Sequence, residues 1–487
     1  MGNPSQNRRN YANRVRITTM RVVVLGAGYA GLTVIRRLER LLPETVELLL
    51  VDESDTHLLV HELHRVVRKP AIAETITLSL ADIVSQAEIR QGRVTNVDTD
   101  EKLITIETAE TGASNETTGN DETGASNKTT ETDANDGSEE DTETDANDKT
   151  TETLTYDVAA VCLGSETNFY ELPGVEANAI PLKRLSHAEQ IRERAFEIPE
   201  GNVVIGGAGL SGVQVAGELA ALSREEVLAL DITLVEAEDR VAPGFNETFA
   251  DALERELESV GISIETGVAV ESATESEVTL ADGRTLPADL FIWTGGIQGP
   301  SALGGERPSV DSELELAEGT FVVGDAGNVV DADGTAVPAS AQTAVGQARV
   351  AAKNIAERVE RETGDGVTIP DRYRYESPGW VVSVGDGAVA HIGPVVVNGE
   401  PARAAKAAIG AGHLGSVGAI GRASALVASE LGLPGADCAR GPKSLDNVLA
   451  SLPTDPASPG QFGYPLANFA FGLTKSVTGD EPIDLTR

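Results

Sequence analysis

The stretch RVVVLGAGYAG, residues 21–31, decides the fold of this chain. An apolar run leads into a G-x-G-x-x-G turn, a helix-like run follows over residues 32–42, and a second apolar run over residues 46–51 ends in Asp52. Strand, glycine turn, helix, strand and acid, in that order, are typical of a dinucleotide-binding βαβ unit. We therefore predict that the folded part of the chain opens with such a unit.

Each glycine of this unit, and the acid that ends it, has its own expected role. Gly26 allows the tight turn, Gly28 lets the backbone approach a pyrophosphate, and Gly31 lets the helix pack closely on the strand. The helix N-terminus offers free N–H groups and a partial positive charge to phosphates. Asp52 follows Gly31 by 21 residues (52 − 31), a spacing that suits a carboxylate bound to a ribose hydroxyl.

A second copy of the pattern begins at residue 202. The apolar residues 203–206 precede a turn with Gly207, Gly209 and Gly212, then come a helix-like run over residues 213–222 and a strand-like run over residues 232–235. This run ends at Glu236, 24 residues past Gly212 (236 − 212). A carboxylate there suits a free ribose 2′-hydroxyl and repels a 2′-phosphate, so the residues favour NADH over NADPH.

Three further apolar runs end in glycine turns. Residues 157–164 contain Cys162, which we expect to be a small core residue, and residues 288–296 end in Gly295 and Gly296. Residues 320–326 contain Gly324 and Asp325, beside an expected helix N-terminus, and a helix is expected from residue 338 to about residue 359.

Length and charge bound the class of protein. The chain has 487 residues, which predicts two or three domains, and its formal net charge is −39. So strong a negative field repels nucleic acid and anionic lipid. The acidic, lysine-poor composition resembles that of proteins from salt-loving archaea, and we interpret it as an adaptation to the solvent. No run of 18 apolar residues is present, so no membrane span is expected.

Cysteine and histidine spacing gives little sign of a metal or disulfide centre. Cys162 and Cys438 are far apart and form no C-x-x-C pair, which fits a reducing cytoplasm. His57, His61 and His64 have a spacing that could place them on one helix face as metal ligands. Without an H-E-x-x-H pattern we prefer to interpret them as polar residues of a loop and a helix over the first domain, and we expect no metal.

Two segments are expected to be disordered. Residues 1–19 contain four arginines without an apolar core, so we interpret them as an extension rather than a signal peptide. Residues 108–153 are acidic and contain little that is apolar except alanine. Such a segment cannot bury enough surface to offset its ordering entropy. It lies between runs that look like paired strands, so we predict an expanded hairpin loop within one domain.

The motifs together resemble one family. GAGYAG, YDVAAVCLGS, GGAGLSGVQVAGEL, LFIWTGG, VVGDAG and PASAQTA occur in the order found in two-dinucleotide flavoprotein reductases. Within the pyridine nucleotide-disulfide reductase-like flavoproteins, the chain most resembles the type II NADH dehydrogenases, single-subunit NADH:quinone oxidoreductases. The resemblance covers roughly residues 20–107 and 154–395.

The resemblance implies an α/β fold with two Rossmann-like domains and a smaller C-terminal region. An FAD-binding domain would occupy residues 20–180 and 300–370, interrupted by an inserted NAD-binding domain over residues 181–299. Residues 371–487 would form an interface or membrane-docking region.

The resemblance also assigns cofactors and site residues. FAD would be held by the first glycine turn with Asp52, and by Gly324 and Asp325. NADH would be held by the second turn with Glu236 and Gly295. Ala341 and Gln342 would lie by the isoalloxazine on the quinone side. The implied reaction is hydride transfer from NADH to flavin N5, followed by electron transfer to a quinone.

Two departures from the family pattern bear on the mechanism and the location. Where the family usually has a glutamate, this chain has Gln214, which can hydrogen-bond but cannot titrate. We regard Gln342 and Gln214 as the candidate catalytic residues, although Gln214 could equally be a polar residue of the helix surface, and Glu218 as an acid that could be structural. Residues 401–432 lack the aromatic anchors of an interfacial helix. A peripheral membrane surface, a homodimer surface and a packed small-residue helix all stay open for that region, and residues 464–471 form its aromatic cluster.

Competing functions remain open. A sulfide:quinone reductase would need cysteines beside the flavin, and a ferredoxin-type reductase would use the same two sites with a protein acceptor. A slow redox-sensing flavoprotein that binds NADH is an alternative from a different functional class, and Gln214 is the feature that favours it. We expect the protein in the cytoplasm, free or peripheral on the cytoplasmic face of the membrane.

Overall fold

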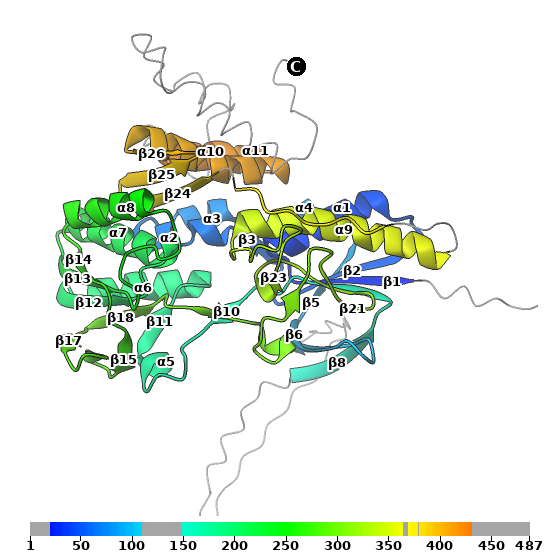
Figure 1. Ribbon diagram of the computed structural model, residues 1–487, viewed down its shortest axis with the longest axis horizontal. Helices are drawn as coiled ribbons and strands as arrows, with labels where there is room; N and C mark the ends of the chain where they lie inside the picture. The colour runs from blue at the N-terminus through cyan, green and yellow to red at the C-terminus, as the bar shows by residue number, and fades with distance from the viewer. Residues whose placement is uncertain (1–19, 110–148, 364–368, 378, 431–487) are drawn as a thin grey trace, which may run out of the picture.

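The computed structural model describes residues 20–109, 149–363, 369–377 and 379–430 (Figure 1). Two sheets with their helices lie side by side, and a third, smaller layer of strands and helices lies above the left one and reaches the middle of the molecule in this view. The predicted α/β class with two dinucleotide-binding units and a C-terminal region is confirmed. The predicted extension over residues 1–19 lies outside the described residues.

The first sheet has the strand order β21-β22-β9-β1-β2-β5, with all neighbours parallel except β21 and β22. Its strands are β1 (Arg21–Leu25), β2 (Glu47–Asp52), β5 (Glu88–Gln91), β9 (Val158–Val161), β21 (Glu315–Ala317) and β22 (Thr320–Val322). The central strand β9 is apolar and buried along its whole length, as is typical of a strand inside a parallel sheet. Residues from before and after the second sheet thus share one sheet, which is the predicted insertion.

Two helices from opposite ends of this domain pack together beside the sheet. They are α1 (Tyr29–Leu41) and α9 (Ala341–Thr363). Helix α1 begins at Tyr29 rather than at the predicted residue 32, because Gly28 is its N-cap and the rest of the glycine turn forms its first turn. Helix α9 begins at Ala341 rather than at residue 338, and the Ser340 hydroxyl accepts a hydrogen bond from Thr343 N at 3.1 Å.

The second sheet is fully parallel, in the order β11-β18-β12-β13-β14. Its strands are β11 (Ala179–Pro181), β12 (Glu200–Gly206), β13 (Ala229–Val235), β14 (Ser263–Glu265) and β18 (Leu290–Trp293). The helices of this domain are α6 (Leu185–Glu197), α7 (Leu210–Glu225) and α8 (Glu247–Ser259). Helix α7 starts three residues before the predicted residue 213, for the same reason as α1. The chain enters and leaves this domain through a short antiparallel pair, β10 (Glu166–Thr167) and β19 (Ile297–Gln298).

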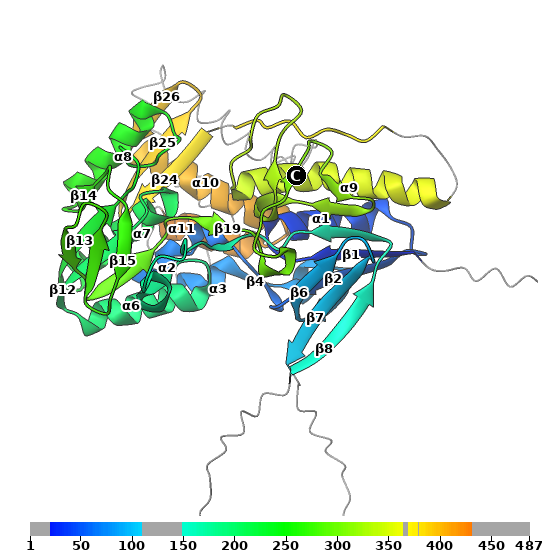
Figure 2. The ribbon, with the colours of Figure 1, turned by 60° about the horizontal axis from the view of Figure 1, so that its bottom comes forward.

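A three-stranded antiparallel sheet projects from the first domain (Figure 2). Its strands are β6 (Arg93–Asp98), β7 (Leu103–Ala109) and β8 (Lys149–Thr155). The predicted pairing of the two loop flanks is confirmed, with Ile104 opposite Leu154. The loop bounds of 108–153 were too wide, because the ladder continues to Ala109 and Lys149. Threonine-rich segments favour strands even when polar, and the remaining residues 110–148 lie outside the described ranges.

The C-terminal layer contains a three-stranded sheet and two helices. These are β24 (Gly379–Val384), β25 (Gly387–Ile392), β26 (Val395–Asn398), α10 (Glu400–Ser416) and α11 (Ile420–Glu430). Helix α7 packs on β24, and α11 packs on α3 (Ile72–Ile76) of the first domain. The described part of residues 401–432 forms two helices rich in small residues, α10 and α11, which pack against each other. No described helix is both long enough and apolar enough to cross a membrane. Residues 431–487, with Cys438 and the aromatic cluster, are outside the described ranges.

Short elements connect these layers. They are β3 (Thr56–Leu58), η1 (Val60–Glu62), α2 (His64–Arg68), α3 (Ile72–Ile76), β4 (Thr77–Ser79), α4 (Leu80–Ile83), α5 (Val175–Asn178), β15 (Val270–Ala273), β16 (Glu277–Leu280), β17 (Thr285–Pro287), η2 (Ser301–Leu303), β20 (Ser309–Val310), η3 (Gly324–Ala326) and β23 (Asn328–Val329). Helix α2 matters most for the site, because it packs against α6 and α7 of the second domain while belonging to the first.

Candidate functional site: two glycine loops and the residues between them

The first glycine loop joins β1 to α1 and is shaped by close backbone contacts. Gly26 has φ +94°, and a Cβ there would lie 2.4 Å from the carbonyl oxygen of Cys162. A Cβ at Gly31 would lie 1.7 Å from the Gly26 carbonyl oxygen. A Cβ at Gly28 would meet no atom within 4 Å. Gly26 and Gly31 are therefore required by the fold, whereas Gly28 keeps one face of the loop open.

The second glycine loop, between β12 and α7, repeats this geometry. Gly207 has φ +100°, and a Cβ at Gly212 would lie 2.0 Å from the Gly207 carbonyl oxygen. Gly209 is open in the same way as Gly28. A Cβ at Gly207 would lie 2.6 Å from Gly295 Cα, so the turn after β18 lies against this loop. The match of the two loops, position by position, indicates two sites for the same kind of ligand.

The two predicted acids occupy equivalent positions at the two loops. Asp52 accepts hydrogen bonds from Ala27 N at 2.5 Å and Ser54 N at 2.8 Å, one at each carboxylate oxygen. Glu236 accepts from Ala208 N at 2.7 Å and Glu238 N at 3.1 Å, also one at each oxygen. A carboxylate has about four acceptor positions, so both acids keep capacity for ligand hydroxyls. Burial raises the pKa of Asp52, and its two N–H donors partly offset that effect.

Asp325 lies at the carboxyl end of β22, at the same edge of the first sheet as the first loop. Its Oδ1 atom is buried without a hydrogen-bond partner, although Arg307 Nε donates to its backbone carbonyl at 2.8 Å. Burial raises the pKa of the Asp325 carboxyl, while the charges of Lys183 and Arg307 lower it. Buried acceptors are normally hydrogen-bonded. The orphaned oxygen therefore fits a ligand that offers hydroxyl groups between Asp325 and the first loop.

Lys183 is a candidate site residue that the sequence did not reveal. It follows β11 at the start of the second domain, and its Nζ donates to Ser165 Oγ at 3.1 Å. Burial lowers the pKa of Lys183, and the charge of Asp325 opposes that shift. A half-buried lysine near an acid of the other domain was not visible in the sequence, because the two residues are far apart along the chain. Its place directly after an apolar strand was the only signal.

The N-terminus of α9 meets the first loop. A Cβ at Gly324 would lie 3.3 Å from both Ala30 Cβ in α1 and Ala344 Cβ in α9, and Gly324 N donates to Gln347 Oε1 at 2.7 Å. Ala341 and Gln342 form the first turn of α9, and Gln342 Nε2 donates to the Glu376 carbonyl at 3.1 Å. The predicted FAD-side residues thus gather around one edge of the first sheet.

Gln214 lies apart from this group, in the second turn of α7. It is half-buried, and no hydrogen bond joins it to the other predicted site residues within the described chain. Glu218, one turn later, is buried and lies 3.8 Å from Arg68 Nη1. Burial raises the pKa of Glu218 to about 7, against the charges of Lys406, Arg68 and Arg65. The titratable group of this helix face is therefore Glu218.

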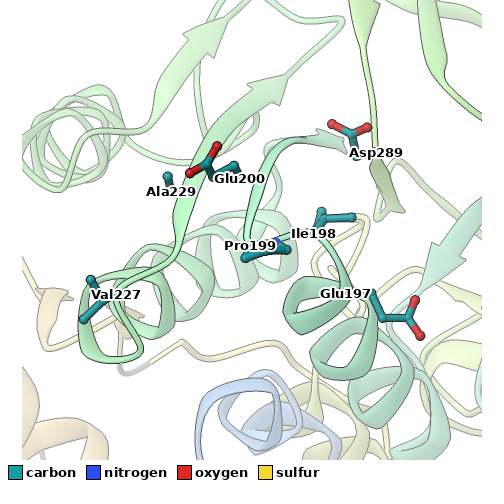
Figure 3. Close-up of a pocket in the computed structure, with 7 residues that line it drawn as sticks. All are labelled: Glu197, Ile198, Pro199, Glu200, Val227, Ala229 and Asp289. Carbon is teal, nitrogen blue, oxygen red and sulfur yellow. The ribbon is translucent and has the colours of Figure 1, made fainter.

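A separate surface pocket is remote from both loops (Figure 3). It is lined by Glu197, Ile198, Pro199, Glu200, Val227, Ala229 and Asp289. Strands β12 and β13 begin at this pocket, whereas the glycine loop follows the carboxyl end of β12. Dinucleotides bind at the carboxyl ends of parallel strands, so this pocket belongs to a different face. Among the described residues, no group of three or more His, Cys, Asp or Glu side chains could hold a metal ion.

Comparison with known proteins is consistent with this geometry. Residues 20–348 match the family model described as pyridine nucleotide-disulphide oxidoreductase. A type II NADH:quinone oxidoreductase of Staphylococcus saprophyticus is 25% identical over 424 residues, 80% of this chain and 92% of the relative. Demethylphylloquinone reductase NdbB of Synechocystis is also 25% identical, over 76% of this chain and 86% of the relative. The structure of NDH2 from Plasmodium falciparum in complex with NADH shares the fold, with TM-score 0.66 and 13% identity over 85% of this chain and 97% of that one.

Proposed function

The chain belongs to the pyridine nucleotide-disulphide oxidoreductase family, and we propose that it is an FAD-dependent oxidoreductase that passes electrons from NADH to a quinone. The observation that carries the proposal is the paired geometry of the two glycine loops, each with its own acid. One loop would bind the flavin dinucleotide and the other the nicotinamide dinucleotide. The names of the two relatives, both quinone reductases, support a quinone as the acceptor.

The residues of the first loop fit FAD. Gly28 leaves the loop open for a pyrophosphate, and the N-terminus of α1 directs its free N–H groups and partial positive charge to the same place. Asp52 keeps acceptor capacity for ribose hydroxyls, and the unpaired Oδ1 of Asp325 suits the hydroxyls of the ribityl chain. When bound, FAD would supply the chemistry of the reaction, since it accepts hydride and releases electrons to a second substrate.

The residues of the second loop fit NADH. Gly209 leaves that loop open, and Glu236 accepts a hydrogen bond from Ala208 N in the same turn. A carboxylate at this point repels a 2′-phosphate, which favours NADH over NADPH. The contribution of these residues is binding and orientation, and such alignment is itself a large part of the rate enhancement of enzymes.

On the acceptor side, helix α9 is the element that we propose to act. Its first turn contains Ala341 and Gln342 and packs beside Gly324, so the positive end of the helix dipole lies near the FAD-side residues. This end would favour negative charge nearby, and Gln342 would hydrogen-bond the acceptor. Potentiometry on a variant with a disrupted start of α9 should give a lower flavin potential, and an unchanged potential would contradict this role.

Gln214 cannot move a proton, so we assign it an orienting role only. Reduction of a quinone requires protons, and Glu218 is the nearest group on the same helix face with a pKa near neutrality. A sulfide:quinone reductase is a weaker alternative. Cys162 is fully enclosed beneath the first loop, and burial raises the pKa of its thiol, so it stays protonated and unreactive.

The location and assembly of the protein are also proposals. Because the acceptor is lipid-soluble and the donor is NADH, we propose peripheral contact with the cytoplasmic face of the membrane through the C-terminal region. Its described part exposes Val395 and Ile420. A second copy of the chain is the competing occupant of this surface. Flotation with phospholipid vesicles tests the first, and sedimentation in concentrated salt tests the second.

Rapid mixing under anaerobic conditions tests the function. NADH should bleach the absorbance of the bound flavin, and a menaquinone analogue should restore it. Bleaching without recovery by the quinone would exclude a quinone reductase and favour a protein acceptor or a sensor.

A further inference from the structure

A polar cluster, buried at its two central histidines and half-buried at its other two members, joins the first glycine loop to the C-terminal helix α10. Its members are Tyr29, in the loop itself, His57 on β3, His61 in η1 and His413 on α10. His57 is 0% exposed and His413 is 6% exposed. The two residues are 356 positions apart in the chain, so sequence patterns could not bring them together. Figure 1 shows α10 and α11 (orange) lying over the blue elements of the first domain.

The hydrogen bonds of His57 fix its tautomer. His57 Nδ1 lies 2.8 Å from the carbonyl oxygen of Ala27, in the glycine loop. A carbonyl oxygen only accepts, so Nδ1 carries the proton and donates. His57 Nε2 lies 3.0 Å from His413 Nε2, and with His57 neutral this Nε2 accepts, so His413 is the donor. Burial lowers the pKa of His57 to about 4 and that of His413 well below its ordinary value, so both rings are neutral near pH 7.

The aromatic ring of Tyr29 is enclosed by the same histidines. Its centroid lies 4.7 Å from that of His413 and 5.3 Å from that of His57, both in edge-on geometry. Its hydroxyl forms a hydrogen bond with His61 Nδ1. Tyr29 directly follows Gly28, the open position of the loop. Helix α10 therefore contacts the loop at two points, through the Ala27 carbonyl by way of His57 and through the Tyr29 ring directly.

A second set of buried groups fixes α10 on the first domain. Lys406 Nζ, on α10, lies 3.0 Å from His64 Nε2 and 3.8 Å from Glu62 Oε2. Arg65 bridges Glu62 and Glu430, on α11, at 3.1 Å each. Removing one member of such a network leaves a buried charge unpaired, which is strongly destabilising. The network therefore holds the C-terminal helices in one register, and with them His413.

From these contacts we propose that His57 and His413 are positioning residues for FAD, and that α10 is part of the FAD-binding apparatus. His413 holds the His57 ring, and His57 holds the Ala27 carbonyl, which sets the path of the loop beside Gly28. FAD affinity then depends on the contact between His413 and His57. The inference rests on the proposed function in one respect, namely that the first loop binds FAD.

The test is the dissociation constant for FAD of the full chain, measured by flavin fluorescence in concentrated salt. His57→Phe and His413→Phe should each weaken FAD binding by about tenfold, because each leaves a buried acceptor without its donor. The double variant should bind FAD no more weakly than His57→Phe, because His413 reaches the Ala27 carbonyl only through His57 and phenylalanine at position 413 keeps an aromatic ring beside Tyr29. His413→Gln keeps an N–H donor and should bind FAD more tightly than His413→Phe.

The matched control is His64→Phe, the same substitution at a buried histidine that contacts α10 but not the loop. It should lower thermal stability but leave the dissociation constant for FAD unchanged, because the ion pairs of Arg65 and Lys406 that hold α10 and α11 do not involve His64. NAD⁺ binding at the second loop should be the same in all variants that fold. The positioning role of His57 and His413 is wrong, while the proposed function stands, if the parent binds FAD and the His57 and His413 variants bind it as tightly as the parent. It is also wrong if His64→Phe weakens FAD binding as much as these variants do. If the parent binds no FAD, both fail. If the phenylalanine variants do not fold without FAD, the rate of FAD release from purified His413→Gln holoprotein decides the question. We expect FAD to leave this variant faster than it leaves the parent, and an equal rate would contradict the proposal.

Discussion

Gly28 offers a direct test of where the pyrophosphate of FAD binds. Its φ of −68° and ψ of −165° lie in a region that alanine adopts without strain. A Cβ at this residue would meet no atom within 4 Å. Gly28→Ala therefore adds a methyl group only to the open face of the loop, and we expect the variant to fold but to bind FAD poorly.

The expected magnitudes follow from these contacts. Alanine is a poorer N-cap than glycine, but it also lowers the entropy of the unfolded chain, and the two effects leave a net change within about 1 kcal/mol. Loss of even one charge-assisted hydrogen bond to the pyrophosphate costs about 1.5–3 kcal/mol, so the dissociation constant for FAD should rise by at least about tenfold. Gly31→Ala is the contrasting variant, because its Cβ would lie 1.7 Å from a carbonyl oxygen.

The assay combines thermal unfolding of the apo protein with FAD titration. Gly28→Ala should match the parent in unfolding temperature and differ in FAD affinity, whereas Gly31→Ala should be strongly destabilised. Gly209→Ala, at the equivalent open position of the second loop, should weaken NAD⁺ binding and spare FAD binding. An FAD dissociation constant for Gly28→Ala within about threefold of the parent would refute the assignment of the pyrophosphate to this loop.

Three further predictions concern charge. Glu236→Gln keeps an acceptor for Ala208 N but removes the negative charge, so the ratio of kcat/KM for NADH to that for NADPH should fall, and an unchanged ratio would remove Glu236 from cofactor selection. His57 has a pKa of about 4 in the folded protein and an ordinary pKa of 6.5, so the unfolded state binds more protons between these two values. The free energy of unfolding should therefore fall by about 3 kcal/mol as the pH drops from about 6.5 to 4. Denaturant unfolding of His57→Phe should show a free energy of unfolding that depends less on pH over that window. Glu218 has the opposite sign, because its pKa of about 7 lies above the ordinary 4.5, so the folded state binds more protons and its contribution is lost as the pH rises from 4.5 to 7. The unfolding free energy of Glu218→Gln, relative to the parent, should therefore increase over that window, and a constant difference would show that Glu218 titrates normally.

Much of the fold and of the cofactor-side site could be predicted from local patterns. The glycine turns, their acids and the apolar strands are encoded within short segments, because a tight turn, a helix start and a buried parallel strand each demand particular residue types. The element ends were less well predicted. Both helices after the glycine turns start inside the turn, and the β7–β8 ladder extends into polar residues, since backbone pairing does not require apolar side chains.

The features that sequence analysis missed depend on contacts between distant segments. The neutrality of His57 comes from burial beneath α10, and the pKa of Glu218 comes from its enclosure between α7, α2 and the C-terminal layer. His57, His61 and His64 were interpreted as polar residues over the first domain, but they occupy three different elements and His57 and His64 are buried. Lys183 is important only because the second domain brings it near Asp325.

The central claim is that this chain carries electrons from NADH through FAD to a quinone. Its most direct test is the absorbance of the flavin in the purified protein, followed anaerobically in concentrated salt as NADH and then a menaquinone analogue are added. The account predicts rapid bleaching by NADH and full recovery on addition of the quinone. A protein that contains no flavin, or a flavin that NADH bleaches but the quinone does not reoxidise, would contradict it.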